Sequence, residues 1–191
     1  MALLAYGCAL LLGCATQGAQ STEERWITLV DGEKGLENFT RIRDANWRPE
    51  NGAIVADKGK GGHLLSKQAF GDFQLRVEFW SDHTTDSGVF IRASDLERFG
   101  GTSYEVQIRD ERSDGYGTGS IVGVAKVSPS LKAGGQWNTY LITATGPHLV
   151  VELNGKKTVD VEDSKFTHGP LTLQFGGRGP IKFRKVQVRM L

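Results

Sequence analysis

The chain has 191 residues, with 23 lysine and arginine residues against 22 aspartate and glutamate residues. This length favours one compact domain with its own hydrophobic core. The near-zero net charge provides no long-range field toward nucleic acid or an anionic membrane, so we expect no nucleic-acid partner. The 25 glycines are spread without a period, which excludes collagen and favours an all-β domain rich in turns.

Residues 1–14, MALLAYGCALLLGC, form an apolar leader. The run is shorter than the roughly 20 residues that span a bilayer as a helix, so it indicates a secretory signal. Its last four residues, LLGC, resemble the bacterial lipobox, and the resemblance implies a lipid on Cys14. We therefore expect an exported lipoprotein of the periplasm or outer membrane, held to the membrane through its lipid anchor only. The alternatives are a signal cut elsewhere or an N-terminal strand of the domain.

Residues 15–24, ATQGAQSTEE, are predicted to form a short flexible tether, and residues 25–191 the folded domain. Both cysteines, Cys8 and Cys14, lie in the leader. Once the leader is processed, the domain has no thiol for a disulfide or a cysteine-based metal site.

Strand patterns follow from residue 25 onward. In residues 73–80 the apolar residues occupy the odd positions, so the even positions face the other side of a sheet. Residues 87–92 and 104–109 alternate in the same way, and no long window has the helical period. The pattern predicts an all-β domain.

Residues 148–153 and 156–161 flank Asn154-Gly155, a pair that favours the type I′ turn of a β-hairpin because both central residues need positive φ. Further on, residues 171–175 present one apolar face, and a last strand is predicted over residues 181–191. Its alternation slips between Phe183 and Val186, which predicts a bulge. Strands of this number must close into a sandwich or barrel to bury their apolar faces.

Several familiar catalytic patterns are missing. The glycine-rich stretch at residues 115–119 has no following lysine to hold a phosphate, and there is no GxSxG elbow. The acidic turn of Asp110, Glu111 and Asp114 lacks the ligand spacing of a calcium loop. The four histidines occur singly, without a zinc-site spacing, and each is expected on the surface or in a loop: His63, His83, His148 and His168.

Polar side chains on the non-core faces of the strands carry the remaining chemistry, and they would line one groove if their strands are neighbours. These candidates are Glu78, Trp80, Arg92, Glu105, Gln107 and Gln174. The alternative interpretation is a set of cross-strand ion pairs and solvated side chains.

Ten short motifs occur in a characteristic order: WITLVDG (26–32), WRPENGAI (47–54), GHLLSK (62–67), FGDFQLRVEF (70–79), DSGVFIR (86–92), YEVQI (104–108), GSIVG (119–123), WNTY (137–140), GPLTLQ (169–174) and FRKVQV (183–188). The series resembles the 3-keto-disaccharide hydrolase domain family, which joins 3-keto-α-glucoside-1,2-lyase and 3-keto-2-hydroxy-glucal hydratase activities. The resemblance implies an all-β, two-sheet antiparallel jelly-roll sandwich of the concanavalin A-like type over residues 25–191. It also implies that the partner is a keto-sugar or another carbohydrate.

The resemblance further implies cleavage of 3-keto-glucosides or 3-keto-disaccharides by elimination followed by hydration. A ketone at C3 acidifies the C2 hydrogen, so a base can remove it and the C1 substituent can leave. Such a site needs a base, a cation or donor at the C3 oxygen, an acid near the leaving group and apolar surface for the sugar ring.

On this resemblance we expect Glu105 to be the general base, with Arg92 or a divalent metal ion stabilising the enediolate. Glu78 or Asp110 would be the acid. The residues expected to contact the sugar are Gln107, Gln174, Arg109 and, by stacking, Trp80. Because guanidinium groups stabilise a nearby carboxylate, Arg92 and Arg109 are expected to lower the pKa of Glu105.

Three other functions remain open from the sequence. A noncatalytic carbohydrate-binding module can use the same fold, because a curved sheet can hold a sugar without reacting. A surface interaction or structural lipoprotein is a second. A retaining or inverting glycosidase needs paired carboxylates, and the pair Glu105 and Gln107 supplies only one. The sequence also leaves open the metal requirement and the oligomeric state.

Overall fold

A computed structural model describes residues 25–95, 100–129 and 131–191. The predicted leader with Cys14, and the tether, lie outside the described residues. Apart from one short 3-10 helix, η1 (Leu36–Asn38), the regular elements of the described residues are strands. No helix in this part of the chain has the length and apolarity needed to cross a bilayer.

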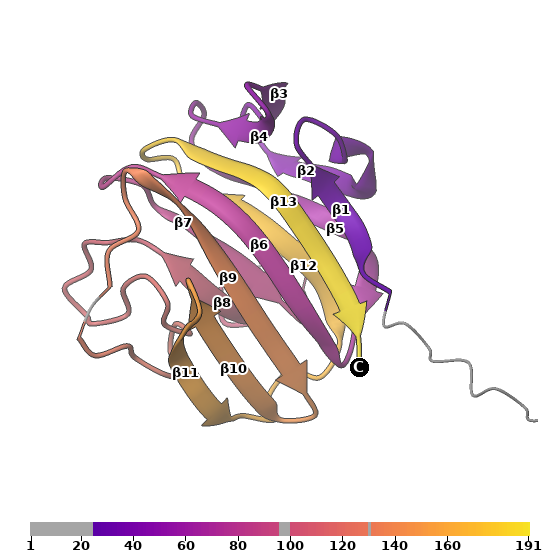
Figure 1. Cartoon of the computed structure of the whole chain (residues 1–191), viewed down its shortest axis with the longest axis vertical. Coiled ribbons are helices and arrows are strands. Elements are labelled where there is room, and N and C mark those ends of the chain that lie inside the picture. The colour runs from indigo at the N-terminus through magenta and orange to yellow at the C-terminus, as the bar shows by residue number, and fades with distance from the viewer. Residues whose placement is uncertain (1–24, 96–99, 130) are drawn as a thin grey trace, which may run out of the picture.

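The strands form two antiparallel sheets that pack face to face, with β9, β6 and β13 of the larger sheet in front of β12, β7 and β8 in Figure 1. The larger sheet has eight strands. Seven of them follow the order β11 (Lys156–Glu162), β10 (His148–Leu153), β9 (Gln136–Thr145), β6 (Phe73–Ser81), β13 (Ile181–Met190), β4 (Ala53–Ala56) and β3 (Arg48–Glu50), and β1 (Ile27–Asp31) also pairs with β13. The predicted all-β, two-sheet antiparallel sandwich is confirmed.

The smaller sheet carries the site described below. Its five strands follow the order β2 (Phe39–Arg43), β5 (Gly62–Phe70), β12 (Gly169–Phe175), β7 (Ser87–Ile91) and β8 (Tyr104–Ile108). After β8 the chain forms a long loop, which returns to the sheet through a bridge between Val106 and Ile121.

The hydrophobic core lies between the two sheets. On β6 the four odd-numbered apolar side chains from Phe73 to Phe79 are fully buried, as their alternation predicts. They face apolar side chains of the smaller sheet, among them Val89, Val106 and Leu173. Burial of these side chains supplies the main favourable free energy of folding.

Two local predictions are confirmed. Asn154 and Gly155 both have positive φ, 51° and 77°, in the two-residue turn between β10 and β11. The pairing of β13 with β6 shifts register between Phe183 and Lys185, which is the bulge that the slipped alternation predicts.

Candidate functional site

The outer face of the smaller sheet gathers three polar side chains and one aromatic ring from four neighbouring strands. Residues directly opposite one another in paired strands lie on the same face. Phe90 pairs with Glu105 across β7 and β8, and Gln174 pairs with His63 across β12 and β5. Since Val89 and Leu173 point into the core, these four side chains point outward.

Two hollows on this side meet at Glu105. The first, which we call the polar hollow, has a volume of about 160 Å³ and is lined by Arg43, His63, Phe90, Gly100, Glu105 and Gln174. The second, the apolar hollow, has a volume of about 240 Å³ and is lined by Gly100, Gly101, Ser103, Tyr104, Glu105, Val122, Gly123, Val124, Lys165 and Phe166. Glu105 therefore reaches ligands in both.

Burial raises the pKa of Glu105 to about 7, and the negative charge of Asp86 adds to this effect. The guanidinium of Arg112 and a hydrogen bond from Gln107 act in the opposite direction. The net shift contradicts the sequence expectation that nearby arginines lower this pKa, because loss of water around the carboxylate outweighs the attraction of the cation. Near neutral pH the carboxyl group can both accept and donate a proton.

The backbone of β7 gives Glu105 its place. A Cβ atom built on Gly88 would lie 3.2 Å from both Cγ and Oε1 of Glu105. Glycine at this position therefore lets the carboxylate lie close against the sheet. The amide Nε2 of Gln107 also donates to Glu105 Oε1, at 3.3 Å.

His63 is a buried, uncharged polar group in the polar hollow. Burial lowers its pKa to about 4, and the positive charge of Arg43 acts in the same direction. Its ring meets Phe90 edge-on with centroids 5.3 Å apart, and its Nδ1 lies 3.4 Å from the hydroxyl of Thr172. At neutral pH a neutral imidazole can exchange hydrogen bonds with a ligand without adding charge.

Gln174 presents an acceptor to the same hollow. Its Oε1 is buried and has no hydrogen-bond partner among the described residues. An unpaired buried acceptor costs about 1–3 kcal/mol, and a ligand that donates a hydrogen bond removes this cost. A sugar hydroxyl is such a donor.

Arg43 supplies the cation of the polar hollow. It ends β2, its φ is 66°, and its side chain is exposed and forms no ion pair with the described residues. Its guanidinium can therefore turn to an oxygen of a bound ligand without breaking an ion pair. Arginine donors of this kind stabilise negative charge that develops on oxygen.

Arg92, the predicted cation of the site, serves the fold instead. Its φ is 54°, and this left-handed backbone takes the side chain out of the alternation of β7. The guanidinium is fully buried and donates to the carbonyl oxygens of Gly71, Gly146 and Phe166 and to Asp72 Oδ1, at 2.7 to 3.2 Å. The prediction for Arg92 is wrong because all of these donors are occupied by loops of the sandwich.

Glu78 and Trp80 lie on the other sheet, and their predicted roles are wrong. Both point outward from β6, which belongs to the larger sheet, so the core separates them from Glu105. Arg184 Nε donates to Glu78 Oε2 at 2.7 Å, and the ammonium of Lys182 lies 4.7 Å from the Trp80 ring centre. The alternation correctly predicts that these side chains point outward, but it does not predict to which of the two sheets their strand belongs.

Asp110 holds the loop after β8 and is wrong as the predicted acid. Its carboxylate is buried and accepts from the Thr118 hydroxyl at 2.9 Å and from the backbone amides of Ala133 and Gly134 at 2.8 and 2.9 Å. Both carboxylate oxygens therefore accept hydrogen bonds from the chain that follows β8, and neither faces one of the two hollows.

Gln107 and Arg109 do not line the hollows but influence Glu105, directly or through Asp86. Gln107 is buried and contacts Glu105 but lines neither hollow. Arg109 Nη1 donates to Asp86 Oδ2 at 3.1 Å, and Asp86 in turn raises the pKa of Glu105. Of the residues predicted to contact a sugar, Gln174 is the one that the polar hollow contains.

Sequence reasoning missed Arg43, and its expectation that His63 lies on the surface or in a loop is wrong, because His63 is buried on β5. The alternation of residues 62–67 does not mark His63 as polar and outward, because Leu65 also points outward and packs with Phe90 and Ala93. The signal available for His63 was its place in the GHLLSK motif.

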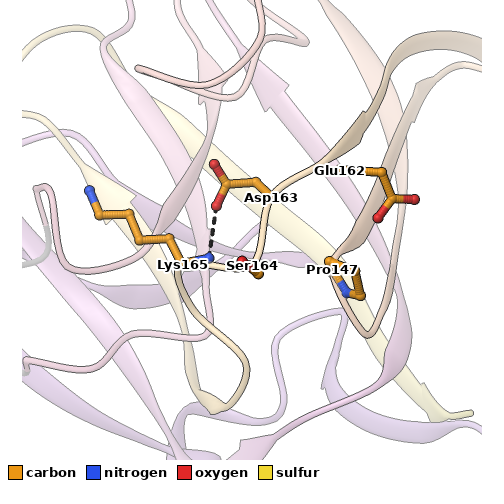
Figure 2. Close-up of a pocket in the computed structure, with 5 residues that line it drawn as sticks. All are labelled: Pro147, Glu162, Asp163, Ser164 and Lys165. Carbon is orange, nitrogen blue, oxygen red and sulfur yellow. Dashed lines mark hydrogen bonds between the residues drawn. The ribbon is translucent and has the colours of Figure 1, made fainter.

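A larger hollow shares Lys165 with the apolar hollow but does not contain Glu105. It measures about 580 Å³, is shallower than the apolar hollow, and is lined by Pro147, Glu162, Asp163, Ser164 and Lys165 (Figure 2). Hydrogen bonds from the Tyr104 hydroxyl and the Lys165 amide hold the pKa of Asp163 below its usual value. Figure 2 shows Glu162 and Lys165 pointing away from each other.

A divalent metal ion does not fit the described residues. Among them, no group of three or more histidine, cysteine, aspartate or glutamate side chains gathers to hold a metal ion. The steps derived below therefore use side chains alone.

A family model described as a 3-keto-alpha-glucoside-1,2-lyase-like domain matches residues 25–189. No protein with a curated description matches the chain in sequence.

Solved structures share the fold. One, provisionally described as a glycosyl hydrolase from Parabacteroides distasonis, is 26% identical with a TM-score of 0.72, over 87% of this chain and 100% of its own. A second from the same species, similarly described, is 16% identical with a TM-score of 0.74, over 88% of this chain and 95% of its own. The carbohydrate-binding module CBM66 from Bacillus subtilis is 14% identical with a TM-score of 0.60, over 86% and 94% of the two chains.

Proposed function

Because this chain belongs to the 3-keto-alpha-glucoside-1,2-lyase-like domain family, we propose that it cleaves 3-keto-glucosides or 3-keto-disaccharides. The reaction is removal of the C2 proton, expulsion of the C1 substituent and later addition of water. One observation carries the proposal: a largely buried carboxyl group, Glu105, has a pKa of about 7 and lies where the two hollows meet.

The keto-sugar ring binds in the polar hollow. Gln174 Oε1 accepts a hydrogen bond from a sugar hydroxyl, and neutral His63 exchanges a second. Phe90 supplies apolar surface for the C–H groups of the ring. These contacts replace the water around the sugar and hold C2 toward Glu105.

In the first step, the Glu105 carboxylate takes the proton from C2. The C–H electron pair forms the C2–C3 double bond, and the carbonyl electrons move to the C3 oxygen. Arg43 lines the same hollow and donates to this oxygen, which stabilises the enediolate.

In the second step, the electron pair on the C3 oxygen restores the carbonyl group. The C2–C3 double bond shifts to C1–C2, and the C1–O bond breaks with its electrons on the leaving oxygen. Protonated Glu105 gives its proton to that oxygen, because it also lines the apolar hollow where the leaving group lies. One residue therefore serves as base and then acid, and the balance requires no oxidant. Water then adds across the C1–C2 double bond of the conjugated enone to give the free 3-keto sugar.

The direct test is incubation of the protein with 3-keto-trehalose and with methyl 3-keto-glucoside. We expect transient ultraviolet absorbance of the enone and release of the alcohol. Glu105→Gln should lower the rate at least ~100-fold. Glu78→Gln is the matched control and should keep wild-type activity, since this carboxylate lies on the other sheet. Full activity of Glu105→Gln, with circular dichroism unchanged, would remove Glu105 from the reaction.

A noncatalytic carbohydrate-binding module is the second candidate, because the module CBM66 shares the fold. Saturable binding of sugars in the polar hollow, without enone or released alcohol from any keto-glycoside, would favour this function. Loss of binding in Gln174→Leu would then identify the hollow as the binding site.

A further inference from the structure

The apolar hollow differs in chemistry from the polar hollow beside it. Its apolar and aromatic lining residues are Tyr104, Val122, Val124 and Phe166. Among the described residues, its charged lining side chains are Glu105 and Lys165. The Gln174 amide and the His63 imidazole, which suit a sugar ring, line the other hollow.

The walls of the apolar hollow are fixed by hydrogen bonds. The Val122 amide donates to the Glu105 carbonyl oxygen at 3.0 Å, which holds the loop after β8 against the sheet. On the opposite side, the Phe166 amide donates to the Tyr104 hydroxyl at 3.1 Å, and the two rings meet edge-on with centroids 5.0 Å apart. These bonds therefore hold two segments of the lining in place before a ligand binds.

A second sugar suits the apolar hollow poorly. Its hydroxyl groups would face the valine side chains and the Phe166 ring, where they would lose hydrogen bonds to water without replacement. A flat aromatic ring carries no such groups and can pack against Phe166.

Lys165 adds a charge preference. Its ammonium group lies 5.3 Å from the centre of the Phe166 ring and forms no ion pair with the described residues. An anionic group on a ring packed against Phe166 would lie within reach of this ammonium group.

We infer that the apolar hollow binds an aromatic leaving group carrying a carboxylate, so that the substrates are 3-keto-glycosides of phenolic acids. This inference rests on the proposed function. In the elimination, the C1–O bond electrons go to the phenol oxygen, and the proton that Glu105 took from C2 follows them. A phenol needs less assistance from an acid than an alkyl alcohol, and among the described residues Glu105 is the carboxyl group that lines this hollow.

Binding of 4-hydroxybenzoate, the free phenolic acid, tests the inference without turnover. Calorimetry should detect saturable binding to the wild-type protein, and binding of 4-hydroxybenzamide should be at least tenfold weaker. Lys165→Gln should abolish this preference for the carboxylate. Lys156→Gln, at the exposed start of β11, is the matched control and should retain it.

Turnover of the 3-keto-glucosides of the same two phenols extends the test. The carboxamide withdraws electrons at least as strongly as the carboxylate, so an intrinsic leaving-group effect does not favour the acid. We expect kcat/KM to be at least tenfold higher for the carboxylate substrate than for the carboxamide substrate, because its KM is lower. In Lys165→Gln the ratio of the two kcat/KM values should fall to about one.

The outcomes separate the two proposals. Turnover of 3-keto-trehalose without binding of 4-hydroxybenzoate, or equal binding by wild type and Lys165→Gln, would overturn the aromatic leaving group and leave the proposed function intact. Binding that depends on Lys165 without turnover of any keto-glycoside would overturn the proposed function, and the leaving-group role with it.

Discussion

Glu105 combines two properties that a base for C2 requires. Its partial burial raises the pKa to about 7, so the carboxylate attracts a proton more strongly than an ordinary glutamate. Its position between the hollows brings it to both C2 and the leaving oxygen. Holding an acidic group in a poorly solvated place lowers stability when it ionises, and such sites are where enzymes place their acids and bases.

The pH dependence of the reaction follows from this pKa. The base must be ionised to accept the C2 proton, so kcat/KM should rise with pH through an apparent pKa of about 7. Arg112 lowers the pKa of Glu105, so Arg112→Gln should move the rising limb to higher pH. Arg184→Gln on the other sheet is the control and should leave the profile in place. A limb that Arg112→Gln leaves unmoved would show that another group titrates.

Arg92 should matter for stability. Its buried guanidinium satisfies three carbonyl oxygens and Asp72, so Arg92→Gln leaves acceptors without partners. We expect the free energy of unfolding to fall by about 3 kcal/mol in urea titrations. The exposed Arg41→Gln control on β2 should change it by less than about 0.5 kcal/mol. An unchanged urea midpoint for Arg92→Gln would contradict this structural role.

At the scale of single residues, alternation along the strands predicted Glu105 and Gln174 but was wrong for Arg92. The reason is local, because the positive φ of Arg92 ends the alternation one residue after β7. His63 was missed because apolar residues share its face of the sheet. Burial and neighbouring charges set the pKa values of these groups, and the sequence alone gives neither.

Among the elements, β7 and β8 position the base. Gly88 lies beneath the Glu105 side chain, and a methyl group there would lie 3.2 Å from its Cγ and Oε1. Gly88→Ala should therefore displace the carboxylate and lower kcat by about 10- to 100-fold, with little change in the thermal unfolding midpoint. In the control Gly71→Ala, the new Cβ meets its nearest atom at an ordinary 3.6 Å, so activity should persist. Wild-type kcat in Gly88→Ala would show that this close packing is not needed.

The elements themselves were largely predictable. The Asn154-Gly155 hairpin and the bulge in β13 followed from local residue patterns. The sheet to which each strand belongs did not follow, because long-range pairing decides it. This is why Glu78 and Trp80 were grouped with Glu105, although β6 and β8 lie in different sheets.

For the whole molecule, we propose that residues 1–14 direct export and that Cys14 carries the lipid anchor. Cys14→Ser should move the protein from the membrane fraction to the soluble fraction of cells that export lipoproteins. Cys8→Ser is the matched control and should stay with the membrane. Membrane association of Cys14→Ser equal to that of the wild type would contradict the anchor.

The fate of the C2 hydrogen tests the elimination most directly. When 3-keto-trehalose is cleaved in deuterium oxide, the enone must regain a proton at C2 from solvent. Nuclear magnetic resonance of the released 3-keto-glucose at early times should therefore show deuterium at C2. The same reaction with Glu105→Gln should incorporate no deuterium at C2. A released sugar that keeps its original C2 hydrogen would contradict proton removal by Glu105.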